Sequence, residues 1–191
     1  MEGREVTVDE LHVRLDASWE SEGFLTRAHE DARREAAHAA LDRFWTEQQA
    51  EPASPIGVEQ EFAFRLGRDR IRGRMDLVEQ ANGQVRITDY KSSDVRDPAT
   101  ANRRSRESLQ LGIYALAWEA IHGSPPDELA LHFLDSGIVG RSSATAERMT
   151  RTTEQVARAA EGIRGSVFTA SPSAMRCGSC PFREICPDAS R

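Results

Sequence analysis

The chain has 191 residues, of which 39% are hydrophobic and 29% charged, and its formal net charge is −6. These values indicate a globular protein with one sizeable core, and they disfavour a surface that coats nucleic acid over its whole extent. No apolar run reaches the roughly 18 residues of a membrane-spanning helix, and the first residues lack the apolar segment of a secretory signal, so we expect no membrane partner and a cytoplasmic location.

The N-terminal part predicts two helices. Residues 8–49 have apolar side chains at helical spacing, with an interruption near Gly23, and Thr7 or Asp9 is the expected N-cap. Residues 52–55 contain two prolines, and they predict the end of the second helix and a short linker.

The central part predicts strands. Three segments alternate polar and apolar residues: 57–66, 70–78 and 85–90. Asn82 and Gly83 are a strong signal for a tight turn between the last two segments, so we expect these two strands to form a hairpin.

The C-terminal half predicts one long helix, two strands (the second at an edge) and a further helix: residues 105–122, 129–134, 138–142 and 152–163. Strands followed by a helix and another strand indicate an α/β fold with a mixed central β-sheet flanked by helices. The expected parts of this single domain are a helical segment, a core and a cysteine-rich tail, over residues 1–55, 56–170 and 171–191.

Three ionisable residues are expected to meet at one end of the predicted sheet. Asp76 precedes Asn82 by the same number of residues as Asp89 follows Gly83, so the two carboxylates fall at matching heights of the hairpin. Lys91 is two residues beyond Asp89 and shares its face of the strand. Two carboxylates suit Mg²⁺ or Mn²⁺, which acidify water and bind phosphates, and a lysine can assist. The spacing alone fits an ordinary surface ion pair equally well.

Three segments around these residues resemble, in the same order, successive motifs of the PD-(D/E)xK nuclease superfamily and of its RecB-like branch. They are Gly73-Arg74-Met75-Asp76, Thr88-Asp89-Tyr90-Lys91-Ser92 and the stretch from Gln110 to Leu116. The resemblance implies a restriction-endonuclease-like core that hydrolyses DNA.

The resemblance also implies roles for individual residues. Asp76 and Asp89 resemble the family's metal ligands for Mg²⁺ or Mn²⁺, with the backbone carbonyl of Tyr90 as a third ligand. Lys91 resembles the catalytic lysine.

Gln110 and Tyr114 resemble a further motif, which approaches the active site and the DNA strand. They lie one helical turn apart and so on one face of the predicted helix. Without the resemblance, a surface glutamine and a core tyrosine explain them as well.

Arginines form two clusters along the chain. The first contains Arg65, Arg68, Arg70, Arg72 and Arg74, and the second contains Arg103, Arg104 and Arg106. A solvated strand face and a helix start explain these clusters as well as contact with DNA does.

The three cysteines lie close together near the end of the chain: Cys177, Cys180 and Cys186. In a cytosolic chain this clustering favours a metal or cluster site over disulfides. The spacing resembles the C-terminal half of the iron–sulfur staple of AddB-type nucleases, in which a fourth, upstream cysteine completes a [4Fe–4S] cluster. Such clusters and zinc sites ordinarily need four ligands, so three unligated thiols are the alternative.

The RecB-like branch also implies a histidine within a G-x-x-x-H pattern on an N-terminal helix. His12, His29 and His38 do not follow that pattern. We therefore hypothesise that the chain is a C-terminal fragment of a larger, ATP-binding helicase–nuclease, and that the motif histidine and the fourth cysteine lie upstream of Met1.

Together these features predict a metal-dependent DNA exonuclease that acts in double-strand break repair and recombination. Its expected partners are a single DNA strand at the active site and the helicase domains of the parent chain, or a partner helicase–nuclease subunit. Two alternatives stay open: a catalytically inactive DNA-binding module of the same fold, and a CRISPR-adaptation nuclease of the same superfamily.

Overall fold

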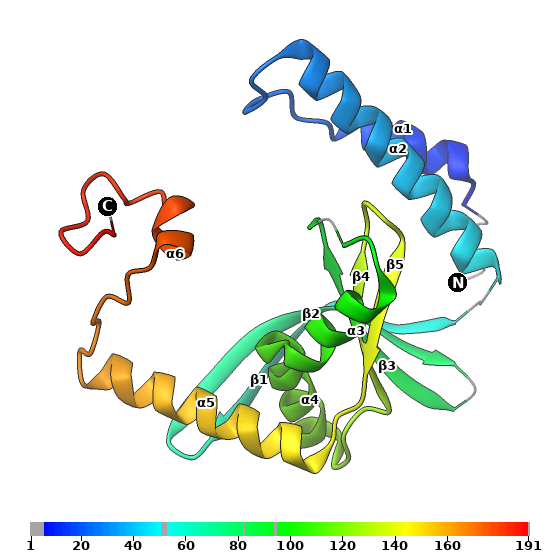
Figure 1. The fold of residues 1–191 in the computed structure, drawn as a ribbon. Coiled ribbons are helices and arrows are strands. Elements are labelled where there is room, and N and C mark those ends of the chain that lie inside the picture. The colour runs from blue at the N-terminus through cyan, green and yellow to red at the C-terminus, as the bar shows by residue number, and fades with distance from the viewer. Residues whose placement is uncertain (1–5, 51–52, 82, 94, 191) are drawn as a thin grey trace. The chain divides into compact units, whose positions relative to one another are not determined.

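A five-stranded mixed β-sheet with the strand order β1-β2-β3-β4-β5 is the centre of the fold (Figure 1). The strands are β1 (Ser54–Leu66), β2 (Asp69–Ala81), β3 (Gln84–Lys91), β4 (Glu128–Phe133) and β5 (Ile138–Ser142). Strands β3 and β4 are parallel, and the other neighbouring pairs are antiparallel. The predicted α/β class with a mixed central sheet is therefore confirmed.

The computed structural model describes residues 6–50, 53–81, 83–93 and 95–190. The chain divides into two units, of which the first ends at Thr153 and the second begins at Glu154. The first unit holds the whole sheet. Within the described ranges, no helix has the length and apolar character needed to cross a membrane.

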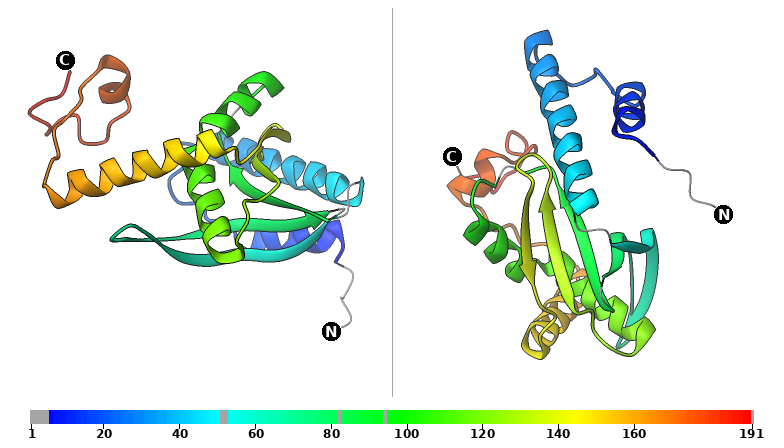
Figure 2. Two further views of the ribbon diagram at one scale, coloured as in Figure 1. Left: turned by 90° about the horizontal axis from the view of Figure 1, so that it is seen from below. Right: turned by 90° about the vertical axis from the view of Figure 1, so that its right-hand side faces the viewer.

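Helices lie on both faces of the sheet (Figure 2). The helices of the described chain are α1 (Val8–Ala17), α2 (Arg27–Ala50), α3 (Pro98–Glu107), α4 (Leu109–His122), α5 (Ala146–Arg164) and α6 (Ala174–Gly178). Apolar residues of α3 and α4 join the core on one face. On the opposite face, the ring of Phe44 in α2 lies 6.1 Å from that of Tyr90 and 6.0 Å from that of His132, measured between centroids.

The core lies between the sheet and α4. Val78, Ile87 and Leu129, from three neighbouring strands, and Leu111 and Ala115, from α4, are all completely buried. Burying a large aliphatic side chain stabilises a fold by about 1.5–3 kcal/mol. These contacts therefore fix the position of α4 against β3.

Strand β2 takes part in two ladders of different length. It pairs with β3 only from the hairpin turn as far as Leu77 opposite Thr88, whereas it pairs with β1 almost along its whole length. Residues 60–75 of β1 and β2 consequently form a two-stranded extension, the arm, which projects past β3 (Figures 1 and 2). Asp76 lies at the fork where the arm leaves the sheet.

The sequence predicts one helix over residues 105–122, but the structure contains α3 and α4 with a break at Ser108. The Ser108 backbone is extended, and its hydroxyl accepts a hydrogen bond from the backbone N–H of Leu111. The guanidinium of Arg148 donates to the carbonyl oxygens of Ser105 and Ser108, at 2.8 and 3.1 Å, and so satisfies carbonyl groups that have no helical partner at the end of α3. The prediction of a continuous helix was wrong because these partners lie far away in the sequence.

Two further boundaries differ from the predictions. Strand β1 begins at Ser54, inside the predicted linker, because Pro55 lies on an edge strand and is followed by a bulge, where a missing N–H is tolerated. Helix α5 begins at Ala146, well before the predicted Thr152, and its first turns bury Met149.

The predicted N-terminal helices are confirmed. Helices α1 and α2 lie on either side of the break near Gly23, and Thr7 is the N-cap of α1 in a reciprocal capping box with Glu10. The predicted signals at Pro52 and Asn82 lie outside the described residues.

Candidate active site

The carboxylate of Asp76 lies where β2 separates from β3. Since Leu77 pairs with Thr88, Asp76 and Asp89 occupy the next position of the hairpin, as their spacing predicts. The backbone N–H of Tyr90 donates a hydrogen bond to Asp76 Oδ2 at 3.0 Å. A side chain of β2 thus binds the backbone of β3 at the end of their ladder, and this bond holds the Asp76 carboxylate beside Asp89.

Asp89 is an almost completely buried carboxylate, with 1% of its surface exposed. Burial raises the pKa of Asp89, the hydrogen bond and the positive charge of Lys91 oppose this rise, and the nearby Asp76 adds to it. Asp89 Oδ2 lies 2.6 Å from Lys91 Nζ, and Oδ1 accepts a hydrogen bond from the Tyr114 hydroxyl at 3.3 Å. The ion pair at Oδ2 and the hydrogen bond at Oδ1 together orient the carboxylate.

Gln110 completes a closed ring of contacts with these residues. Lys91 Nζ donates to Gln110 Oε1 at 2.7 Å, and Gln110 Nε2 donates to the Tyr114 hydroxyl, also at 2.7 Å. The Tyr114 hydroxyl donates in turn to Asp89, whose other oxygen contacts Lys91. The structure therefore brings together four residues singled out from the sequence, which we call the Asp89 ring, with Asp76 next to them.

The members of the Asp89 ring differ in their exposure to solvent. The side chain of Lys91 is 34% exposed, whereas that of Asp89 is 2% exposed. Tyr114 is buried, and this raises its pKa to about 12, so its hydroxyl remains a hydrogen-bond donor at neutral pH. Lys91 is thus the charged member that reaches solvent, and Tyr114 supports Asp89 from inside the protein.

Helix α4 supplies two members of the ring from its first turns. Gln110 and Tyr114 are four residues apart, so their side chains lie above one another on one face of the helix. The start of this helix is set by Ser108, and Arg148 binds the Ser108 carbonyl. Arg148 is almost completely buried, with 4% of its surface exposed. Through its bond to Ser108, this residue of α5 helps to position Gln110 in the first turn of α4.

Gly73 allows an aromatic contact behind Tyr114. Gly73 pairs with Phe62 across the arm, and a Cβ atom at residue 73 would lie 2.5 Å from the Phe62 ring. The Phe62 ring meets that of Tyr114 edge to face, with 5.8 Å between centroids. The glycine at the start of the Gly73-Arg74-Met75-Asp76 segment is therefore needed for the packing that supports Tyr114.

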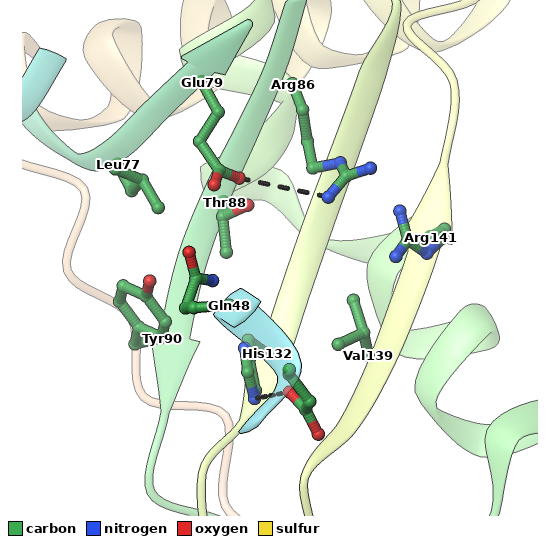
Figure 3. Close-up of a pocket in the computed structure, with 10 residues that line it drawn as sticks. Gln48, Leu77, Glu79, Arg86, Thr88, Tyr90, His132, Val139 and Arg141 are labelled. Carbon is green, nitrogen blue, oxygen red and sulfur yellow. Dashed lines mark ion pairs between the residues drawn. The ribbon is translucent and has the colours of Figure 1, made fainter. Parts of the chain in front are cut away.

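The alternate residues of β3 face the other side of the sheet (Figure 3). Arg86, Thr88 and Tyr90 line a small polar pocket there, in which Arg86 lies 4.0 Å from Glu79. The ring of Tyr90 is directed into this pocket, where burial raises its pKa to about 12. Only the backbone of Tyr90 is therefore available on the side of Asp89.

The two carboxylates fit one common type of divalent-metal site. Mg²⁺ is often held by one or two carboxylates, and water and phosphate oxygens complete its octahedral shell. Asp76 and Asp89 offer this set of hard oxygen atoms. The described part of the chain has no group of three or more His, Cys, Asp or Glu side chains that could hold a metal ion. The backbone carbonyl of Tyr90 remains the predicted third protein ligand.

The cysteines do not form such a site in the described part of the chain. Cys177, Cys180 and Cys186 are free, partly buried thiols of the second unit. The sulfur of Cys177 accepts a hydrogen bond from the backbone N–H of Ser190 at 3.3 Å. The iron–sulfur cluster stays a prediction, and no part of the site described above depends on it.

Sequence reasoning did not identify the supporting residues. Ser108 could have been found, because a serine before a helical segment is an N-cap signal. The sequence also contains a signal for Lys91 that the motif spacing did not use. Lys91 is the single lysine of the chain, and the other basic residues are arginines and five histidines. No local pattern could have indicated Arg148 or Phe62, because both act across long sequence separations.

Comparisons with known proteins identify the family of the chain. Residues 2–187 match the family described as the PD-(D/E)XK nuclease superfamily. The chain is 27% identical over 143 residues to the Gene 69 protein of Mycobacterium phage D29, and 28% identical over 136 residues to the Gene 69 protein of Mycobacterium phage L5. These alignments cover 71% and 68% of this chain but 49% and 44% of the phage proteins, so the chain spans about half the length of these relatives.

Among solved structures, the crystal structure of SSO0001 aligns with 96% of this chain and with 95% of its own, at a TM-score of 0.48 and 16% sequence identity.

Proposed function

Because the chain belongs to the PD-(D/E)XK nuclease superfamily, we propose that it is a Mg²⁺- or Mn²⁺-dependent deoxyribonuclease. It hydrolyses a phosphodiester bond of DNA at the site formed by Asp76, Asp89 and Lys91. The observation that supports this proposal is the Asp89 ring, in which a buried carboxylate has partners on both oxygens while the lysine reaches solvent.

Asp76 and Asp89 hold the metal ion, which when bound would acidify the attacking water and neutralise charge on the phosphate. The hydrogen bond from Tyr90 N–H holds the first carboxylate, and the Asp89 ring holds the second. Both ligands are therefore oriented before substrate binds, which lowers the reorganisation that the reaction requires.

Lys91 is the charged member of the ring that reaches solvent, and we place the attacking water and the phosphate beside it. Its ammonium group stabilises the negative charge of the pentacovalent transition state, or its amine accepts a proton from the water. Gln110 positions Lys91 by accepting a hydrogen bond from its ammonium group, and Tyr114 positions Asp89 by donating a hydrogen bond to its carboxylate. Gln110 is exposed, so we also assign it a contact with the DNA strand.

The finer assignment rests on the motif resemblance alone. It comprises exonucleolytic cleavage in double-strand break repair, helicase domains of a parent chain or a partner helicase–nuclease as partners, and an iron–sulfur cluster for which the three C-terminal cysteines supply three ligands and a longer parent chain supplies the fourth. An inactive DNA-binding module is disfavoured by the intact Asp89 ring.

The experiment that tests the proposal uses labelled linear and circular DNA with purified protein and Mg²⁺ or Mn²⁺. Asp89→Asn and Lys91→Ala should abolish cleavage, and EDTA should do the same to the wild type. Asp31→Asn, at an exposed site on α2, is the matched control and should cleave as the wild type does. Cleavage by Asp89→Asn at the wild-type rate, or wild-type cleavage in EDTA, would falsify the proposal.

A further inference from the structure

The arm is a basic element in an acidic protein. Residues 60–75 contain five arginines, one aspartate and one glutamate (Glu61, opposite Arg74), which gives a net charge of +3 in a chain of net charge −6. All five arginines are exposed. The arm projects from the fork at Asp76, so this positive charge begins beside the candidate active site (Figures 1 and 2).

The two faces of the arm differ in character. Phe62, Phe64 and Ile71 lie on the face that joins the hydrophobic core. Arg70 and Arg72 alternate with Ile71 along β2 and so belong to the opposite face. That core contact holds the arm in place, and it leaves the arginine face open to a ligand.

Like charges face each other on the arginine face. Arg65 is directly opposite Arg70 in the β1–β2 register. Such cross-strand pairs of like charge destabilise a sheet. Arg74 is neutralised by Glu59 at 2.7 Å, but Arg65, Arg70 and Arg72 have no ion pair with any residue that the structure describes. A polyanion bound to this face would remove the repulsion.

We infer that the arginine face of the arm binds the phosphate backbone of the nucleic-acid strand that enters the active site. This inference rests on the proposed nuclease function. It adds a second binding surface, which contacts the substrate away from the bond that is cleaved. Strand residues advance by about 3.3 Å, so Arg70 and Arg72 are about 6.6 Å apart. At a rise of about 3.4 Å per stacked nucleotide, this separation corresponds to two nucleotides, so the two arginines contact phosphates two positions apart on one strand.

The position of the arm gives a length requirement for the substrate. Arg72 and Arg70 are four and six residues from Asp76, so they lie about 13 and 20 Å along the strand from the fork. Stacked nucleotides rise about 3.4 Å each. The arm therefore contacts DNA about four to six nucleotides away from the bond that is cleaved, and only substrates of that length benefit from it.

The test compares a triple variant, Arg65→Gln, Arg70→Gln and Arg72→Gln, with a control that removes the same charge elsewhere. The control carries Arg27→Gln, Arg151→Gln and Arg158→Gln, all at exposed helix positions. Binding of a labelled oligonucleotide is measured by fluorescence anisotropy in EDTA over a salt series. Thermal unfolding shows that both variants fold, and loss of the Arg65–Arg70 repulsion should leave the stability of the triple variant equal or higher.

For the triple variant, the plot of the logarithm of the binding constant against the logarithm of the salt concentration should become less steep. The magnitude of its negative slope should decrease by about 2 to 3, because each of the three lost phosphate contacts contributes about 0.7 to 0.9. The control should keep the wild-type slope. Cleavage of oligonucleotides longer than about six nucleotides should slow for the triple variant, whereas hydrolysis of bis(4-nitrophenyl) phosphate, which is too small to reach the arm, should stay unchanged.

The two proposals fail in different ways. Equal salt slopes for the triple variant and the control would overturn the role of the arm, while Lys91-dependent cleavage would still stand. A wild-type protein that binds DNA through the arm but hydrolyses neither DNA nor the small diester would instead overturn the nuclease proposal.

Discussion

The hydroxyl of Tyr114 lies 3.3 Å from Asp89 Oδ1, and it also accepts a hydrogen bond from Gln110 at 2.7 Å. One buried hydroxyl thus connects a proposed metal ligand with the residue that orients the proposed catalytic lysine. Through this hydroxyl, strand β3 and helix α4 maintain the arrangement of the site together.

Replacing this hydroxyl should therefore affect catalysis more than folding. Tyr114→Phe keeps the ring against Phe62 but leaves Asp89 Oδ1 without its donor. A hydrogen bond to a charged group contributes about 1.5–3 kcal/mol, so we expect kcat to fall by about 10- to 100-fold. The midpoint of thermal unfolding should fall by only a few degrees. Wild-type kcat in this variant would exclude a positioning role for Tyr114.

The role of Lys91 can be examined by replacing it with arginine, which is always positively charged. Lys91→Arg keeps the positive charge beside Asp89, but arginine cannot accept a proton at ordinary pH. If Lys91 acts as a base, this variant should lose as much activity as Lys91→Ala; recovery of a substantial fraction of kcat would assign the lysine to charge stabilisation. Amine-selective acylation offers a second measurement: Lys91 is the single lysine of the chain, so mass spectrometry can separate its modification from that of the N-terminal amine, and activity should be lost as Lys91 is modified.

A methyl group at Gly73 should disturb the site from behind. In Gly73→Ala the new Cβ meets the Phe62 ring, so the ring moves and Tyr114 loses its support. We expect a loss of about 1–3 kcal/mol in the free energy of unfolding, together with lower kcat. The double variant Gly73→Ala, Phe62→Leu should recover part of both. Gly178→Ala, where no atom lies within 4 Å of the added Cβ, is the control and should be nearly neutral.

Removing Arg148 should loosen the junction of α3, α4 and α5. Its guanidinium binds the carbonyls of Ser105 and Ser108 and the hydroxyl of Ser142. Because Arg148→Ala leaves these buried groups without their donor, the free energy of unfolding should fall by about 2–4 kcal/mol in denaturant titrations. Arg151→Ala, one turn later and exposed, should change it by less than about 0.5 kcal/mol. Equal effects of the two substitutions would contradict this role.

The cysteines give a spectroscopic prediction. A [4Fe–4S] cluster needs four thiolates and absorbs at roughly 400 nm, whereas this chain has three cysteines, all free. Anaerobically purified protein should therefore show no such absorbance, and three thiols per chain should react with a thiol reagent. An absorbance maximum there with stoichiometric iron would show that another ligand completes a cluster.

Local patterns were sufficient for the strands that bear the site. The alternation along β3 places Asp89 and Lys91 on one face, and the tight turn aligns Asp89 with Asp76, so both the fold class and the pairing could be predicted. Helix α3 could not be predicted from its sequence, because it has no apolar stripe. Among the described residues, its only buried ones are Ala101 and Ser105. The break at Ser108 depends on Arg148, which lies forty residues further along the chain.

The bond between Asp76 Oδ2 and the Tyr90 amide has a practical consequence. Substitution of Asp76 by alanine would leave the Tyr90 N–H without its acceptor and disturb the fork. A loss of activity in that variant would therefore combine the loss of a metal ligand with a structural change. Substitution by asparagine keeps an acceptor oxygen for the Tyr90 N–H. The same bond turns the Tyr90 amide into an intrinsic reporter. When a cation draws electron density from the Asp76 carboxylate, the NMR chemical shift of that single amide should move, and metal binding could be followed with no DNA in the tube.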